Sequence, residues 1–142
     1  MSTDLLKRLA QAAGDIFNDT PVFVAYAYGS RVQGHPRSDS DLDVGYYIHT
    51  ETVSAPPAIQ EEMQMADRLS RILGIEIDLR NLGTAPLELR GRVLEQGRRI
   101  YCSDHVARVN LERNLLGMYH DYKAEFELFH TRRLCAVAAL KG

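Results

Sequence analysis

Runs of apolar residues separated by polar segments divide the chain into short elements. Residues 22–28 form one continuous apolar run, which is typical of a strand buried on both faces. A second strand is predicted over residues 41–49, and residues 75–80 alternate strictly between apolar and polar positions. A short run at residues 99–101 predicts a fourth strand. We therefore expect four strands, each short enough for a small sheet.

Apolar residues at three- and four-residue steps predict helices over residues 3–17, 58–73 and 86–96. Gly74 and Gly97 directly follow two of them and are typical helix stops. In the second helix, one side is expected to face the core, and it carries Met63, Ala66, Leu69 and Leu73. Helices and strands thus follow one another along the chain.

A long final helix is predicted over residues 103–140, with Gly117 as its one weak point. At 1.5 Å per residue it would extend roughly 50–55 Å, which is longer than the domain it belongs to. One apolar stripe runs along it, formed by Leu111, Leu115, Met118, Tyr122, Phe126 and Phe129. Such a stripe is more often core than interface. We nevertheless expect the part beyond Tyr119 to outreach the domain and to contact a partner.

Composition narrows the class of protein. The 142 residues, 45% hydrophobic and 25% charged, are ordinary for one soluble domain spanning residues 1–142. A net charge of −2 argues against stable direct binding to nucleic acid. No apolar run approaches a membrane span, and the N-terminus does not resemble a signal peptide. Cys102 and Cys135 form no C-x-x-C motif, so we expect reduced thiols and a cytoplasmic location.

The most informative stretch is residues 28–44, which lies between the first two predicted strands. Gly29 and Ser30 open it, and Asp41 and Asp43 follow after ten residues. Because a strand alternates its faces, the two carboxylates point the same way, with Cα atoms roughly 6.5 Å apart. Left alone they would repel each other, and one pKa would rise. Carboxylate oxygens of this kind suit Mg²⁺, which also takes water and substrate phosphates as ligands.

Gly29 and Ser30 supply donors for the phosphates. A glycine lets a phosphate approach the backbone closely, and Ser30 offers a hydroxyl and backbone N–H groups. The simpler alternative is a loop in which Ser30 caps a helical turn and the acidic residues are solvated. Arg31 and Arg37 flank the same loop and would either meet triphosphate oxygens or lie in solvent.

The pattern G-S-x10-D-x-D between two strands resembles the active-site signature of the polymerase-β-like nucleotidyltransferase superfamily. The short chain is most similar to the minimal nucleotidyltransferases, in particular the MntA antitoxins that partner HEPN-domain (HepT) toxins. This resemblance covers roughly residues 20–122, although only the motif itself is specific. It implies an α/β (α+β) fold with a small mixed sheet flanked by helices and a long C-terminal helix.

The resemblance also implies a third carboxylate on the strand after the second helix. Asp78 matches that position, and Glu76, two residues earlier, is a competitor that sequence does not exclude. The simpler alternative is that Asp78 is a solvated residue on a half-exposed strand. Two Mg²⁺ ions would then be held by Asp41, Asp43 and Asp78, while Gly29, Ser30 and Arg31 bind the nucleotide.

For function, the resemblance implies an antitoxin that transfers AMP from ATP to a tyrosine of a cognate HEPN ribonuclease toxin, with release of pyrophosphate. Two alternatives remain open. The first is an antitoxin that acts only by binding its toxin. The second is an enzyme that modifies a small molecule, as antibiotic nucleotidyltransferases do, although little chain follows Tyr101 to hold such an acceptor.

Other candidate sites are weaker. The chain has no G-x-x-x-x-G-K-[ST] motif, which excludes the P-loop class. Its five histidines show no spacing typical of a zinc site. A basic cluster on and after the third helix would contact nucleotide or an acidic partner, or simply be solvated; it consists of Arg90, Arg92, Arg98 and Arg99.

Overall fold

The computed structural model describes residues 3–29, 41–49 and 59–141, with side chains as far as Phe129 and also at Thr131 and Arg132. At its centre is a four-stranded sheet in the order β3-β2-β1-β4. The strands are β1 (Val22–Tyr28), β2 (Leu42–Ile48), β3 (Ile77–Asn81) and β4 (Arg98–Cys102). β1 pairs antiparallel with β2 and β4, whereas β2 and β3 are parallel. The predicted mixed sheet is therefore confirmed.

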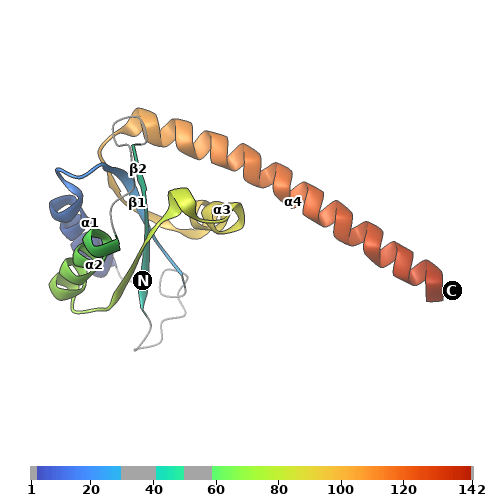
Figure 1. The fold of residues 1–142 in the computed structure, drawn as a ribbon, viewed down its shortest axis with the longest axis horizontal. Coiled ribbons are helices and arrows are strands. Elements are labelled where there is room, and N and C mark those ends of the chain that lie inside the picture. Colours follow the sequence, from blue (N-terminus) through green and yellow to red (C-terminus); the bar gives the residue numbers. More distant parts are fainter. Residues whose placement is uncertain (1–2, 30–40, 50–58, 142) are drawn as a thin grey trace.

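Helices cover both faces of this sheet (Figure 1). α1 (Thr3–Phe17) and α2 (Ile59–Leu73) pack on one face. α3 (Leu87–Gln96) and the first part of α4 (His105–Lys141) pack on the other face. A single 3-10 turn, η1 (Leu82–Thr84), follows β3, and the side chain of Asn81 caps it by accepting a hydrogen bond from the N–H of Gly83 at 2.9 Å. The molecule thus has three layers, with the sheet in the middle.

The core under α1 and α2 follows from the period-two alternation of the strands. Leu42 and Val44 on β2 are fully buried there, next to Ile77 and Leu79 on β3. Burying a side chain of this size contributes about 1.5–3 kcal/mol. Since these residues take every second position, the positions between them, including Asp43 and Asp78, face the opposite side of the sheet.

A second core lies between the sheet and the helices α3 and α4. Phe23, Tyr26 and Tyr47 enter it from the strands, and Val93 enters it from α3. The Tyr26 hydroxyl donates a 2.7 Å hydrogen bond to Glu112, and Arg108 pairs with the same carboxylate at 3.0 Å. This partly buried network attaches the first turns of α4 to the sheet.

Most predicted elements are confirmed, and the differences have local causes. The predicted inward position of Met63 is wrong: its side chain is 66% exposed, whereas Leu69 and Leu73 are buried. The last helix begins at His105 rather than at Ser103, because Asp104 accepts a hydrogen bond from the N–H of Ala107 at 3.0 Å and so acts as the N-cap. The 3-10 turn after β3 was not predicted.

The final helix extends well beyond the other elements, as its length predicts (Figure 1). Leu115 and Tyr119 are buried against the domain, and Lys123 pairs with Glu95 of α3 at 3.5 Å. Farther along, Phe126 is 59% exposed and Phe129 is 67% exposed. Leu115 of the predicted stripe is therefore core, whereas Met118 is 48% exposed and its neighbour Tyr119 is buried instead. From Tyr122 onward the stripe is surface. No helix in the described part of the chain has the length and apolar character needed to cross a membrane.

Candidate functional site

Two of the predicted carboxylates are neighbours across the sheet. Asp43 on β2 lies directly opposite Asp78 on β3 in the parallel register. Since the residues on either side of each are buried against α1 and α2, strand alternation directs both carboxylates to the other face. Asp43 lies beside α3 there, whereas Asp78, on the edge strand, is exposed and also lines a hollow beside α2. Residues 35 positions apart in sequence therefore share one site.

Asp41 directly precedes β2 and is exposed. It is close enough for its charge to act on Asp43. Burial raises the pKa of the Asp43 carboxyl, and the negative charges of Asp78 and Asp41 raise it further. The predicted repulsion between paired carboxylates is therefore present, and the carboxyl whose pKa rises is that of Asp43.

Gly29 follows β1 at the same end of the sheet. Its φ of +94° lies in the region that favours glycine, and a Cβ at this position would collide with Oδ2 of Asp43. The register explains this contact, because Tyr28 is paired with Asp43. The glycine was expected to admit a phosphate, and the structure gives it a second role, which is to make room for the Asp43 carboxylate.

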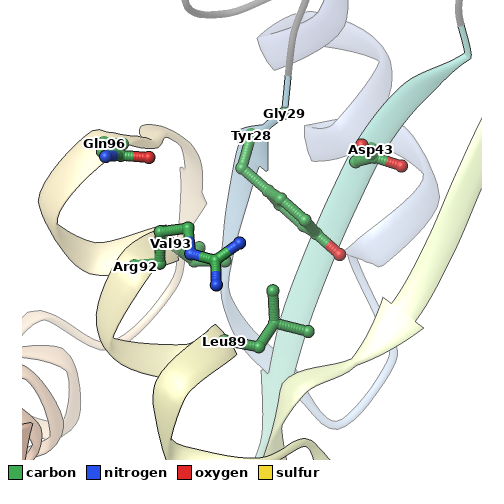
Figure 2. Close-up of a pocket in the computed structure, with 7 residues that line it drawn as sticks. All are labelled: Tyr28, Gly29, Asp43, Leu89, Arg92, Val93 and Gln96. Atoms are coloured by element: carbon green, nitrogen blue, oxygen red, sulfur yellow. The ribbon is translucent and has the colours of Figure 1, made fainter.

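A cavity of about 330 Å³ opens beside Asp43, between the sheet and α3. Its volume falls at the lower end of the range typical of ligand pockets. Figure 2 shows the lining side chains, which come from the end of β1, from β2 and from one face of α3: Tyr28, Gly29, Asp43, Leu89, Arg92, Val93 and Gln96. Burial and the nearby charge of Asp43 raise the pKa of Tyr28, so its hydroxyl stays protonated at neutral pH.

The chemistry of the carboxylates fits a hard divalent cation such as Mg²⁺. Three oxygen donors of like charge lie near one another. Burial, followed by the charges of Asp78 and Asp41, raises the pKa of Asp43, and a bound cation would favour the ionised carboxylate. Within residues 3–29, 41–49 and 59–141, no three His, Cys, Asp or Glu side chains already form a group that could hold an ion. The donor type and the strand register fit, and holding an ion requires these side chains to turn toward a common point.

The other predicted site residues have different places. Ser30 and Arg31 lie outside the described residues, as does Arg37. Glu76 precedes β3, and its backbone carbonyl accepts a 3.0 Å hydrogen bond from Leu42, whereas Asp78 is the residue in register with Asp43.

The sequence alone leaves the role of Arg92 open, and in the structure Arg92 lines the cavity. Its sequence signal was weak, since it is one of four arginines within ten residues. Helical periodicity alone would have put it on the same side as Leu89 and Gln96.

Comparison with known families agrees with the fold and the motif. The family described as Polymerase beta, Nucleotidyltransferase matches residues 13–106. That range is more than half of the chain and contains the strand pair with Asp41 and Asp43, the strand with Asp78, and α3. The chain belongs to this nucleotidyltransferase family. Among curated proteins, none matches in sequence.

Solved structures with a similar fold include antitoxins of MntA–HepT toxin–antitoxin pairs. One is a toxin–antitoxin complex with AMP-PNP, at 19% identity and a TM-score of 0.66, covering 88% of this chain and 98% of that chain. Another is a tri-AMPylated HEPN toxin from Shewanella oneidensis in complex with an MNT antitoxin, at 16% identity and a TM-score of 0.62, covering 94% and 99%. At these identities the likeness shows the fold, which is that of a minimal nucleotidyltransferase with a long C-terminal helix.

Proposed function

We propose that this protein is an Mg²⁺-dependent protein adenylyltransferase that transfers AMP from ATP to a tyrosine hydroxyl of a cognate HEPN-type ribonuclease toxin and thereby neutralises it. The observation that carries the proposal is the pairing of Asp43 with Asp78 on adjacent strands, with Gly29 against Asp43 and a cavity beside these two residues. Family membership supports nucleotidyl transfer. The similar fold of antitoxins solved with AMP-PNP and with an AMPylated toxin supports the choice of ATP and of a toxin.

In this proposal, Asp41, Asp43 and Asp78 hold two Mg²⁺ ions. Bound there, the ions supply positive charge to the phosphates and lower the pKa of the acceptor hydroxyl. The carboxylates suit this role because they are acceptors only and lie on adjacent strands, which fixes their backbone positions. Burial and the neighbouring negative charges raise the pKa of Asp43, and a cation bound here would favour its ionised form.

The chain's own groups then bind and orient the reactants. Gly29 and Ser30 hold the β- and γ-phosphates in this proposal, and Arg31 is assigned to nucleotide binding with them. The acceptor oxygen attacks the α-phosphorus in line, the bond to the bridging oxygen of the β-phosphate breaks, and pyrophosphate leaves. Asp78 accepts the proton of the acceptor hydroxyl. A tyrosine has a pKa near 10, so assistance of this kind is needed at neutral pH.

The distal half of α4 is the surface we assign to the toxin. Its aromatic side chains run from Tyr119, which is buried against α3, through Tyr122 to the exposed rings of Phe126 and Phe129. Rings of neighbouring turns stack at 6.5 and 6.3 Å between centroids, so they form one continuous apolar surface. Aromatic residues of this kind are the usual anchors of protein interfaces.

The test is transfer of label from α-³²P-ATP to the purified toxin in the presence of Mg²⁺. Asp41→Asn or Asp43→Asn should lower the rate by a factor on the order of 10³ or more, because a lost metal ligand removes several kcal/mol of transition-state stabilisation. Asp15→Asn is the matched control, since Asp15 is an exposed carboxylate on α1, the helix that packs on the opposite face of the sheet. It should label the toxin at the normal rate.

Two further results would change the assignment. A doubly substituted Asp41/Asp43 variant that labels toxin at the normal rate would contradict the enzymatic function. If that variant loses labelling but neutralises the toxin as well as the unaltered protein does, binding alone is sufficient. Glu76→Gln and Asp78→Asn, compared in the same assay, separate the two candidates for the third carboxylate; we expect Asp78→Asn to abolish labelling.

A further inference from the structure

Arg92 occupies a position that the catalytic motif does not account for. It lies on α3, in the wall of the cavity opposite the sheet, while Gly29 and Asp43 form the other wall. Figure 2 shows its guanidinium extending from the helix toward Tyr28, with Asp43 beyond it on β2. The cavity therefore has carboxylate on one side and guanidinium on the other, and Tyr28, Leu89 and Val93 also line it.

The neighbouring arginines do not share this position. Arg90, on the same helix, acts on Tyr47 in the second core, where burial raises the pKa of the Tyr47 hydroxyl to about 12 and the charge of Arg90 offsets part of the rise. Arg98 and Arg99 are exposed on β4. Within the basic cluster, Arg92 is the member that lines the cavity beside Asp43.

Arg92 is held there by a contact that is easily exchanged. Its Nη2 lies 3.2 Å from Oε1 of Glu88, one helical turn earlier, and the two side chains are 53% and 58% exposed. An exposed pair at this spacing contributes little to stability. A phosphate group would accept two parallel hydrogen bonds from the guanidinium, and such charge-assisted pairs are stronger. A phosphate entering the cavity would therefore displace Glu88 at little cost.

We propose that Arg92 binds a phosphate group of the nucleotide across the cavity from Asp43, and that Glu88 holds the guanidinium when the cavity is empty. This assignment rests on the proposed function, because it requires a nucleotide in this cavity. It gives the site a positive group on α3 in addition to the phosphate-binding residues at the end of β1. Glu88 then competes with the nucleotide for Arg92, and its negative charge weakens binding.

Nucleotide affinity tests this role without a transfer assay. ATP and adenosine are titrated separately into the complete protein by calorimetry with Mg²⁺ present. Arg92→Gln should weaken ATP binding about 10- to 100-fold, the range for a hydrogen bond to a charged group, and should leave adenosine binding unchanged. Arg71→Gln is the matched control, since Arg71 is also an exposed arginine paired four residues away, with Asp67, but on α2 across the sheet. It should bind ATP normally.

Glu88→Gln tests the exchange itself. Removing the competing charge should strengthen ATP binding by about 2- to 3-fold, in line with the small energy of an exposed pair, and should do nothing in an Arg92→Gln background. Equal losses for ATP and adenosine in Arg92→Gln would mean that the side chain only shapes the cavity, and would overturn the proposal. ATP binding unaffected by Arg92→Gln would overturn it while leaving the proposed function intact. If the unaltered protein binds no ATP, both fail.

Discussion

Asp43 combines a functional position with an unfavourable environment. Its carboxyl is partly buried and faces Asp78 and Asp41, so ionising it opposes folding. Selection for stability alone would not retain three acidic residues in this arrangement, whereas a site that receives cations and phosphates needs them. The same residue is therefore expected to lower stability and to be required for activity.

This conflict predicts a pH-dependent effect of Asp43→Asn. The folded pKa lies above the ordinary value of 3.8, so at neutral pH the ionised carboxylate destabilises the folded state. The variant should therefore have a higher Tm than the unaltered protein at pH 7 in EDTA. As the pH falls through the raised pKa, the folded protein takes up the proton and the difference should shrink, reaching zero below about pH 3.8.

Differential scanning fluorimetry between pH 3 and pH 8 measures this effect. Asp15→Asn, which removes an exposed carboxylate on α1, provides the comparison and should change Tm little. Added Mg²⁺ should raise the Tm of the unaltered protein and not that of Asp43→Asn, because the cation binds the folded state through this carboxylate. A variant that is less stable at pH 7 would show that Asp43 is a structural residue.

At the scale of elements, the position of α3 determines the shape of the cavity, and α3 is held by α4. Gly91 faces the ring of Tyr119, and a Cβ on this glycine would collide with that ring. The pair Lys123–Glu95, at 3.5 Å, lies farther along the same contact. Since Leu89, Arg92 and Val93 line the cavity from α3, the close approach at Gly91 positions them.

We therefore expect Gly91→Ala to lower the free energy of unfolding by about 1–3 kcal/mol, the usual cost of overpacking a core, and to weaken ATP binding as α3 shifts. Gly117→Ala is the matched control. It lies in the middle of α4 with nothing within 4 Å of the added Cβ, so the substitution should stabilise the protein by about 0.5–1 kcal/mol. Chemical denaturation of both variants measures the contrast. Equal effects at the two positions would contradict the packing argument.

The molecule as a whole consists of a three-layered domain and a helix that leaves it (Figure 1). The domain contains all the described residues of the candidate site, while the distal part of α4 carries the exposed aromatic side chains. Catalysis and partner binding are therefore expected to be separable.

Truncation after Ala124 tests this separation. The shortened protein keeps Tyr119 and Lys123, which contact α3, and loses Phe126, Leu128 and Phe129. It should unfold cooperatively and bind ATP like the complete chain. Toxin binding should weaken by about 2 kcal/mol or more for each lost anchor. Unchanged affinity for the toxin, measured by calorimetry, would place the interface elsewhere. Loss of the cooperative transition would show that the distal helix stabilises the domain.

Much of the fold follows from local patterns in the sequence. β1 spans the predicted residues 22–28, because a short continuous apolar run is typical of a strand buried on both faces. Asp41 and Asp43 were predicted to share a face for an equally local reason, since side chains alternate along any strand. The length of α4 also follows from the sequence, as no proline interrupts it. Each of these properties depends on residues within a few positions of one another.

Tertiary structure decided what depends on pairing between distant segments. Which strand lies beside β2, and in which register, places Asp78 opposite Asp43, and a shift of one residue would have turned Asp78 to the other face. Packing of α3 against the sheet places Arg92 at the cavity, whereas the other three arginines of the basic cluster do not line it. Packing also left Met63 exposed although its spacing predicts an inward position, because periodicity gives the direction of a side chain but not the extent of the surface that covers it.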